Sequence, residues 1–264
     1  MNPILKWLRL PYEYFVLYGG LLFFGVMCLS WSLPASLLYP LLPRKIGAPL
    51  GQFVIMAGFR SYIFLLNASG IVKCDLSALD ALRKEGSLII APNHPALIDV
   101  VLVASRLPHI VCVMKAWIWD SLMLGGGARL AGYIRNDSPG NMIRLASAAT
   151  QNGNQLLIFP EGTRTQAHPI NDFKAGFALI AKKAGVPVQT VFIETNSPFL
   201  CKDWPLLKKP EFPIYYRVCL GQRFEVSGDV KTFVSELKRY FIQHLESPNH
   251  CPGESSPLNI TLNA

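Results

Sequence analysis

Short apolar runs alternate with longer helix-like segments along the middle of the chain. The runs are rich in Val and Ile, as buried strands are, and each is followed by a stretch with helical periodicity. This alternation predicts an α/β domain, with a mixed sheet flanked by helices. The strand-like runs are Ser87–Asn93, His109–Lys115, Ala131–Asp137, Asn154–Gly162 and Val186–Thr195, and the helix-like segments are Ala96–Arg106, Trp117–Leu130, Met142–Gln151 and Asp172–Lys183.

The carboxyl-terminal part of the pattern predicts three further segments. Phe212–Val226 has the pattern of two strands joined at Gly221. The next segment repeats apolar residues at helical spacing, which predicts a helix packed on the sheet. The last residues, 247–264, are polar and contain prolines, so we expect a disordered tail. The apolar face of the predicted helix consists of Val230, Phe233, Val234, Leu237, Phe241 and Leu245.

The amino-terminal residues follow a different pattern. Tyr14–Pro43 contains no Asp, Glu, Lys or Arg, and about 20 helical residues are enough to cross a hydrocarbon core. Pro34 predicts a break in this run, with two shorter helices meeting near Ser32–Pro34 as a hairpin. Basic residues flank both ends, so charge does not choose between a spanning helix and a hairpin. We expect a membrane anchor at 1–45 and one domain at 46–246; a buried helix of a soluble protein is the alternative.

Composition and charge favour a membrane and an anionic partner. Hydrophobic residues make up 51% of the chain and charged residues 16%, where about 25% charged is usual. The net charge of +8 suits a bilayer surface or a phosphorylated substrate, and no nucleic-acid-binding motif accompanies it. No C-x-x-C pair occurs, so we expect free thiols in a reducing compartment. The cysteines are Cys28, Cys74, Cys112, Cys201, Cys219 and Cys251.

A histidine and an aspartate interrupt the apolar run Leu88–Pro108. His94 follows a predicted strand, at the end where open α/β sheets commonly bind ligands, and Pro95 suits a helix start. A carboxylate at Asp99 can accept from one imidazole nitrogen and leave the other as a base. The alternative is that His94 caps the helix and Asp99 only favours its positive end. The spacing by itself does not decide between the two.

A second candidate site is Leu156–Thr165, where an apolar strand runs into a turn. Glycine, a hydroxyl and an arginine follow the strand end at Gly162, Thr163 and Arg164, and this combination suits a phosphate. The alternative is a tight turn in which Glu161 and Arg164 form a surface ion pair.

The two sites together resemble the glycerolipid acyltransferase family, in particular its lysophosphatidic acid acyltransferase-like group. The shared motifs are H-x-x-x-x-D from His94 to Asp99 and F-P-E-G-T-R from Phe159 to Arg164. The resemblance covers roughly Leu88–Pro198. Lys115 with Arg135 resembles the basic pair around the family's second motif, and Asp172–Val188 resembles the segment between its third and fourth motifs.

The resemblance implies a membrane-bound O-acyltransferase. An acyl group would move from an acyl-CoA or acyl-ACP thioester to the hydroxyl of a lysophospholipid such as 1-acylglycerol 3-phosphate. It implies that His94 is the base and that Asp99 orients it. No metal and no bound cofactor are implied. Membrane lipids are the expected partners, and the catalytic domain is expected on the cytoplasmic side of the cytoplasmic (inner) membrane. The residues implied to hold the acceptor's phosphate are Glu161, Gly162, Thr163 and Arg164, with Arg135 or Lys115 adding positive charge.

Departures from the family pattern and rival chemistries leave alternatives open. Gly125–Gly127 stands where the family usually has a proline-glycine arrangement, and Thr190 where a second proline is common. In the family, both segments are thought to shape the pocket for the acyl acceptor. One alternative is therefore the same acyl transfer to a specialised lipid. From another class, His94, Asp99 and Glu161 could ligate a metal in a membrane hydrolase, or the chain could be an inert lipid-binding scaffold. Zincin, α/β-hydrolase and P-loop motifs are absent from the sequence.

Overall fold

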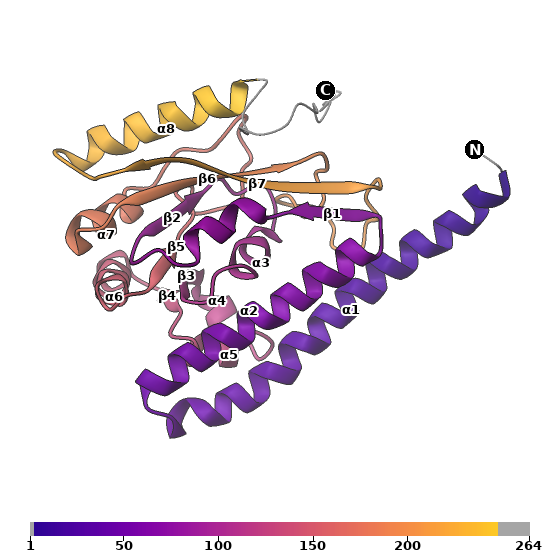
Figure 1. Ribbon diagram of the computed structural model, residues 1–264, viewed down its shortest axis with the longest axis horizontal. Coiled ribbons are helices and arrows are strands. Elements are labelled where there is room, and N and C mark those ends of the chain that lie inside the picture. Colours follow the sequence, from indigo (N-terminus) through magenta and orange to yellow (C-terminus); the bar gives the residue numbers. More distant parts are fainter. Residues whose placement is uncertain (1–2, 248–264) are drawn as a thin grey trace.

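The computed structural model describes residues 3–247 and has an α/β domain beside a long helical hairpin (Figure 1). The predicted tail therefore lies almost wholly outside the described residues. A seven-stranded sheet in the described part has the order β1-β7-β6-β2-β5-β3-β4. Its strands are β1 Val72–Asp75, β2 Ile89–Pro92, β3 Ile110–Lys115, β4 Ile134–Asn136, β5 Gln155–Leu157, β6 Val188–Thr195 and β7 Ile214–Phe224.

The sheet is mixed, as predicted. Strands β6, β2, β5, β3 and β4 are mutually parallel, whereas β7 runs antiparallel to β6 and pairs in parallel with β1. Every residue of β2 and β5 is buried, as expected for central strands covered on both faces. The carboxyl ends of the five parallel strands share one edge of the sheet. The connecting elements are η1 Ser77–Leu82, α3 Asp99–Ala104, α4 Ala116–Trp119, α5 Gly125–Leu130, α6 Pro139–Gln151, α7 Gly176–Ala184 and α8 Val230–Glu246.

All five predicted strands of the central pattern are present, but the predicted helix Trp117–Leu130 is two short helices. A turn at residues 120–124 separates α4 from α5. The α5 backbone approaches the amino-terminal helix so closely that a Cβ on Gly126 would lie 2.0 Å from the Ser32 carbonyl oxygen. The three glycines thus permit a helix contact that a single straight helix of ordinary residues would not make.

The prediction of two strands joined at Gly221 is wrong, because β7 runs through this residue unbroken. Opposite it, the pairing of β6 with β7 shifts register between Gln189 and Val191. A Cβ on Gly221 would lie 2.4 Å from Thr190 Oγ1 and 2.7 Å from the Tyr240 hydroxyl. This glycine marks a close approach inside a strand and not a turn.

The amino-terminal residues form a hairpin, but its turn is not at Pro34. Helix α1 spans Pro3–Leu41 and passes through Pro34; the chain reverses at residues 42–43, and α2 spans Arg44–Ala68. Near the proline, the Gly126 N–H donates to Ser32 Oγ (3.0 Å) and the Ser36 hydroxyl donates to the Ser32 carbonyl (2.8 Å). The first of these bonds ties α1 to α5 beside the proline.

Both hairpin helices are long and apolar enough to cross a membrane, by length and composition. Most of the α1 surface is exposed, whereas α2 lies between α1 and the sheet domain and packs on α3, α5 and β1 (Figure 1). The boundary expected at residue 45 stays a prediction. The second helix of the hairpin continues to Ala68, so the apolar element of this fold is longer than the predicted anchor.

The cysteines fit the prediction of free thiols only in part. Cys28, Cys74, Cys112 and Cys201 are free. Cys219 in β7 is disulfide-bonded, so the prediction is wrong for this residue, and Cys251 lies outside the described residues. Sequence spacing did not indicate the bond because a disulfide requires only that two Cβ atoms meet in space.

Candidate active site

The candidate site lies where β2 and its neighbour β5 end at the same sheet edge. Asn93, directly after β2, is buried and bonds to both backbone groups of Ile193 in β6. Its amide nitrogen donates to the Ile193 carbonyl (3.0 Å), and its side-chain oxygen accepts from the Ile193 N–H (2.7 Å). Asn93 therefore extends the pairing of β2 with β6 by one step and fixes the backbone from which His94 projects.

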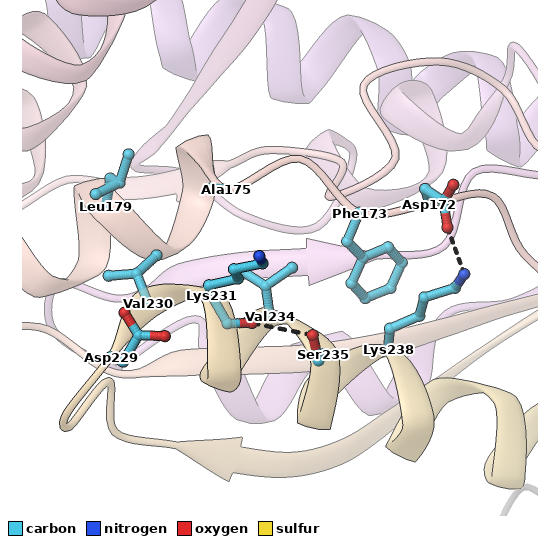
Figure 2. A pocket seen from close by; sticks show the side chains of 10 residues that line it. All are labelled: Asp172, Phe173, Ala175, Leu179, Asp229, Val230, Lys231, Val234, Ser235 and Lys238. Atoms are coloured by element: carbon cyan, nitrogen blue, oxygen red, sulfur yellow. Dashed lines mark hydrogen bonds and ion pairs between the residues drawn. The ribbon is translucent and has the colours of Figure 1, made fainter.

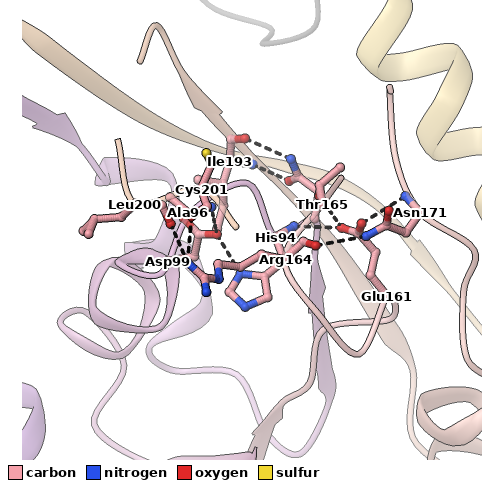
Figure 3. A network of polar contacts seen from close by, with 11 residues as sticks. His94, Ala96, Asp99, Glu161, Arg164, Thr165, Asn171, Ile193, Leu200 and Cys201 are labelled. Carbon is pink, nitrogen blue, oxygen red and sulfur yellow. Dashed lines mark hydrogen bonds and ion pairs between the residues drawn. The ribbon is translucent and has the colours of Figure 1, made fainter. Parts of the chain in front are cut away.

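His94 and Asp99 meet directly (Figure 3). His94 Nδ1 lies 2.8 Å from Asp99 Oδ2, which also accepts from the Ala96 N–H at 2.8 Å. The Asp99 side chain is wholly buried, and 13% of the His94 side chain is exposed. Nε2 of His94 makes no hydrogen bond to another described residue. If the carboxylate accepts from Nδ1–H, the lone pair of Nε2 faces outward and is free to act as a base.

The two residues meet across a turn and not across a helix. Helix α3 begins at Asp99 itself, and residues 96–98 form the preceding turn. Pro95 therefore does not start the helix, and neither Asn93 nor His94 caps it. The separation of five residues, which would point two side chains apart on one helix, here brings them together because the chain folds back before the helix begins.

The turn after β5 holds the other side of His94. The Phe159 ring stacks on the imidazole with centroids 3.8 Å apart, and Glu161 accepts a hydrogen bond from the His94 N–H at 3.0 Å. The Glu161 carboxylate also accepts from the Thr165 hydroxyl (2.8 Å) and from the Asn171 N–H (3.0 Å). Glu161 is thus a buried brace that ties three segments together, and it forms no ion pair with Arg164.

Burial shifts the pKa values of both carboxyl groups. Desolvation raises the pKa of Asp99, although the hydrogen bond from His94 and the charge of Arg164 oppose this increase. Desolvation likewise raises the pKa of Glu161, opposed by its bonds from Asn171, Thr165 and His94. Buried carboxyls with shifted pKa values beside an accessible imidazole are typical of catalytic sites.

Arg164 and Gly162 shape the turn. Arg164 donates from one guanidinium nitrogen to the carbonyls of Leu200 (3.0 Å) and Cys201 (2.8 Å). Leu97, next to the dyad, donates its N–H to the same Leu200 carbonyl. Gly162 has φ +69°, in the left-handed region where side chains are strained, and Thr163 is half-buried. The arginine therefore anchors a backbone segment, and only part of its guanidinium is left for a ligand.

The basic pair lies on the same edge but farther along the sheet. Lys115 ends β3, and its exposed amine makes no hydrogen bond or ion pair with another described residue. Because adjacent strands are about 4.8 Å apart, it starts about 10 Å from β2. Arg135, on the next strand β4, forms ion pairs with Asp120 (2.8 Å) and Asp137 (3.1 Å). Lys115 is thus available to a ligand near His94, whereas Arg135 is already neutralised by two carboxylates.

A second cavity and a metal site are the alternatives to this candidate site. A cavity of about 510 Å³ lies between α7 and α8 (Figure 2). None of the residues that contact His94 lines it, and an ion pair of Asp172 with Lys238 (2.6 Å) lies at one end. Within residues 3–247, no group of three or more His, Cys, Asp or Glu side chains is placed to hold a metal ion. The oxygens of Glu161 instead face hydrogen-bond donors.

Sequence reasoning identified His94 and Asp99 but missed several residues that position them. Asn93 entered only as the last residue of the predicted strand Ser87–Asn93 and Phe159 only as the first residue of the F-P-E-G-T-R motif, and no pattern pointed to Thr165 and Asn171 as supports of Glu161. The only sequence signal was their proximity to the two motifs. Their partners, such as Ile193, lie up to 100 residues away along the chain.

Comparisons with known proteins show similarity to acyltransferases. The sequence model of the family described as Acyltransferase matches residues 73–194, which include both motifs. A 1-acyl-sn-glycerol-3-phosphate acyltransferase from Pseudomonas aeruginosa is 21% identical over 215 residues, covering 79% of this chain and 80% of that protein. A protein with the same name from Cocos nucifera is 33% identical over 104 residues, 36% of this chain and 33% of that protein.

Two further similarities are to a second kind of acyltransferase and to a solved structure. A lyso-ornithine lipid O-acyltransferase from Pseudomonas aeruginosa is 31% identical over 123 residues, 42% of this chain and 47% of that protein. The crystal structure of the 1-acyl-sn-glycerophosphate acyltransferase PlsC from Thermotoga maritima is 19% identical, with a TM-score of 0.61, covering 97% of this chain and all of that one. The fold similarity thus includes the helical hairpin as well as the sheet domain.

Proposed function

We propose that this chain is a member of the glycerolipid acyltransferase family, to which its sequence and fold are similar, and that it transfers a fatty acyl group from a coenzyme A or acyl-carrier-protein thioester to a lysophospholipid such as 1-acylglycerol 3-phosphate. The observation that supports this proposal most strongly is the 2.8 Å contact between His94 Nδ1 and Asp99 Oδ2, which leaves Nε2 directed away from the buried carboxylate. A base of this kind can act on a hydroxyl without any protein nucleophile.

In the proposed reaction, Nε2 removes the proton of the acceptor hydroxyl while the hydroxyl oxygen attacks the thioester carbonyl. The tetrahedral intermediate then collapses, the carbon–sulfur bond breaks, and the imidazolium returns the proton to the leaving thiolate. The Asp99 carboxylate stabilises the imidazolium between these two steps. A thioester is already activated, so proton transfer and alignment supply most of what the enzyme must add.

Substrate binding is proposed at the same edge. The remaining donors of Arg164, the backbone of Gly162 and Thr163, and the amine of Lys115 form a cationic border near His94 that suits a phosphate. Glu161 contributes indirectly, since its carboxylate holds the His94 backbone. Arg135 contributes charge only if it exchanges its two carboxylate partners for a ligand.

We also propose that the exposed apolar surface of α1 associates with a membrane, with the sheet domain at the cytoplasmic face of the cytoplasmic membrane. On α1, 74% of Phe15, 69% of Leu22 and 71% of Leu37 are exposed. Large apolar side chains left exposed along one helix are typical of an interaction surface. Such an arrangement would bring a lipid acceptor and His94 to the same interface.

The test compares wild type with His94→Ala. Purified protein in detergent is incubated with labelled acyl donors, either coenzyme A or carrier-protein thioesters, and with lysolipids, and the products are identified by mass. We expect His94→Ala to abolish transfer while thermal unfolding and vesicle binding stay unchanged. Turnover by His94→Ala at the wild-type rate would refute the mechanism.

A second candidate acceptor is a specialised lysolipid without a phosphate. Two observations favour it. One relative is named as a lyso-ornithine lipid O-acyltransferase. In addition, Arg164 uses one guanidinium nitrogen to bond the carbonyls of Leu200 and Cys201, so fewer of its donors remain for a phosphate. The same assay separates the two, because a phosphate-dependent enzyme should prefer 1-acylglycerol 3-phosphate over 1-acylglycerol. Equal efficiency with both would favour the second candidate.

A further inference from the structure

A groove of about 700 Å³ runs between the carboxyl half of α2 and the end of α3. Its walls include Phe53, Met56 and Phe64 of α2, and Arg106 lies just beyond the carboxyl end of α3. Asp99 is at the opposite, amino-terminal end of this helix. The groove is therefore separate from the candidate active site, and its volume is in the range of small-molecule sites.

Arg60 gives this groove its unusual character. It is the only charged residue between Lys45 and Lys73, and it lies near the middle of the apolar helix α2. Its side chain is exposed along the groove, and no hydrogen bond or ion pair joins it to another residue of the described chain. A charged side chain within an apolar helix of this length is costly and usually has a functional partner.

A second guanidinium with spare donor capacity lines the same groove. Arg106 forms an ion pair with Asp80, which also lies 3.8 Å from Arg83. The Arg106 Nε atom is buried without a hydrogen-bond partner among the described residues, and of the two terminal nitrogens only Nη2 bonds Asp80, which leaves the Nη1 donors for a ligand. Two cationic side chains thus line one groove, and neither has all of its donors satisfied.

The apolar walls are incompletely covered as well. Of their side chains, 57% of Phe53 and 69% of Phe64 are exposed, and both lie on α2, one of the two candidate membrane helices. An occupant of this groove must therefore present an anion to the guanidinium groups and apolar surface to the aromatic rings. Guanidinium groups bind phosphate oxygens through paired N–H donors.

We propose that the groove binds one molecule of an anionic glycerophospholipid. Its phosphate lies between Arg60 and Arg106, and one acyl chain lies against Phe53, Met56 and Phe64. The bound lipid supplies the partner that Arg60 lacks and covers the exposed rings, so it holds α2 against the end of α3. This inference goes beyond the proposed function: the groove can bind a lipid whether or not the hairpin associates with a membrane, and the inference does not depend on the catalytic mechanism.

The binding test is native mass spectrometry of the full chain in detergent. The probes are phosphatidylglycerol, phosphatidylcholine and inorganic phosphate, each added separately. We expect one bound phosphatidylglycerol per chain, binding of phosphatidylcholine that is about tenfold weaker, and no retained inorganic phosphate. Equal retention of both lipids, or retention of inorganic phosphate alone, would overturn the proposal.

Three variants separate the groove from general electrostatics. Arg60→Ala removes the cation, and Ser61→Trp fills the groove without changing the net charge. Lys45→Ala, the matched control, removes one charge from the same helix outside the groove. We expect lipid binding to fall about tenfold in the first two variants and to stay at the wild-type level in the control. Equal losses in Arg60→Ala and Lys45→Ala, or full binding by Ser61→Trp, would contradict the assignment.

Vesicle flotation distinguishes the proposed lipid groove from the proposed membrane association. Protein that floats with phosphatidylglycerol vesicles but holds no lipid in detergent would overturn the groove and leave the membrane association intact. Protein that binds the lipid in detergent but does not float would support the groove and overturn the association. Circular dichroism of each variant confirms that a loss of binding is not a loss of fold.

Discussion

The replacement Asp99→Asn tests the His94–Asp99 pair while changing the shape of the site very little. An asparagine can take two orientations here. With its oxygen at the Oδ2 position, it still accepts from His94 and Ala96, but its amide occupies the buried Oδ1 position, which has no partner among the described residues. With its amide at the Oδ2 position, it donates to Nδ1, faces the Ala96 donor and forces the wrong imidazole tautomer.

In both orientations the imidazolium loses its anionic partner. With Nδ1 and Oδ2 2.8 Å apart, the charge centres are separated by about 4 Å, which corresponds to about 4 kcal/mol at an effective dielectric constant of 20. Each 1.36 kcal/mol is a factor of ten in rate, so the structure predicts that kcat falls by about 10³. KM should change little, because Asp99 is wholly buried and does not reach a substrate.

The assay is acyl transfer at saturating donor and acceptor, with His94→Ala and the double variant measured in parallel. Because Asp99 acts through His94, the double variant should be no slower than His94→Ala alone. Asp99→Asn with a kcat within about tenfold of wild type would refute the assigned role of the pair. A further loss in the double variant would show that Asp99 acts independently of His94.

The same variant makes a prediction about stability and pH. Since burial raises the pKa of Asp99, the folded state holds this proton more tightly than the unfolded chain does. Protonated Asp99 therefore contributes fully to the stability of the folded state below the ordinary carboxyl pKa. This contribution is lost as the pH rises through the raised pKa of Asp99 in the folded state. Asparagine does not ionise, so the unfolding free energy of Asp99→Asn relative to wild type should increase between pH 4 and pH 8. Denaturant titrations in detergent measure this difference, and a constant difference would contradict it.

Other predictions concern the supports of the site and of the hairpin. Glu161→Gln keeps the size of the side chain but replaces one carboxylate oxygen by an amide donor, which faces either the Asn171 N–H or the His94 N–H. We expect the variant to be about 1–3 kcal/mol less stable and to have a lower kcat at unchanged KM. A fully stable and fully active variant would contradict the role of Glu161 as a brace. Gly126→Ala places a Cβ 2.0 Å from the Ser32 carbonyl oxygen, so α5 should separate from α1. Limited proteolysis at residues 120–124 should then become faster. The matched control is Gly140→Ala, where the added Cβ meets open space. Unchanged proteolysis of Gly126→Ala would mean that this close contact does not hold the two helices together.

Local residue patterns were sufficient for the five central strands, because each is a short Val- and Ile-rich run, but they did not predict β1 and they placed a turn within β7. The Val- and Ile-rich runs predicted all five central strands, whereas the spacing of His94 and Asp99 left their pairing open and only the resemblance of both motifs to an acyltransferase family implied it. Helix ends were less predictable. Pro34 is unfavourable in an isolated helix, but α1 continues through it and packs on α5, a contact that no local pattern could reveal. Gly221 similarly resembled a turn because its crowding by Thr190 and Tyr240 arises from other elements.

The sequence by itself determined the fold class, the apolar amino-terminal segment and the residue types of an acid–base pair. The tertiary structure decided how those residues are used: Arg164 holds carbonyls of a loop about 36 residues away, and Asn93 joins β2 to β6 across 100 residues. These roles depend on which backbone groups remain unbonded after the sheet has formed. Since a buried polar group must find a partner wherever the fold offers one, its partner is set by the packing of distant segments and not by its neighbours along the chain.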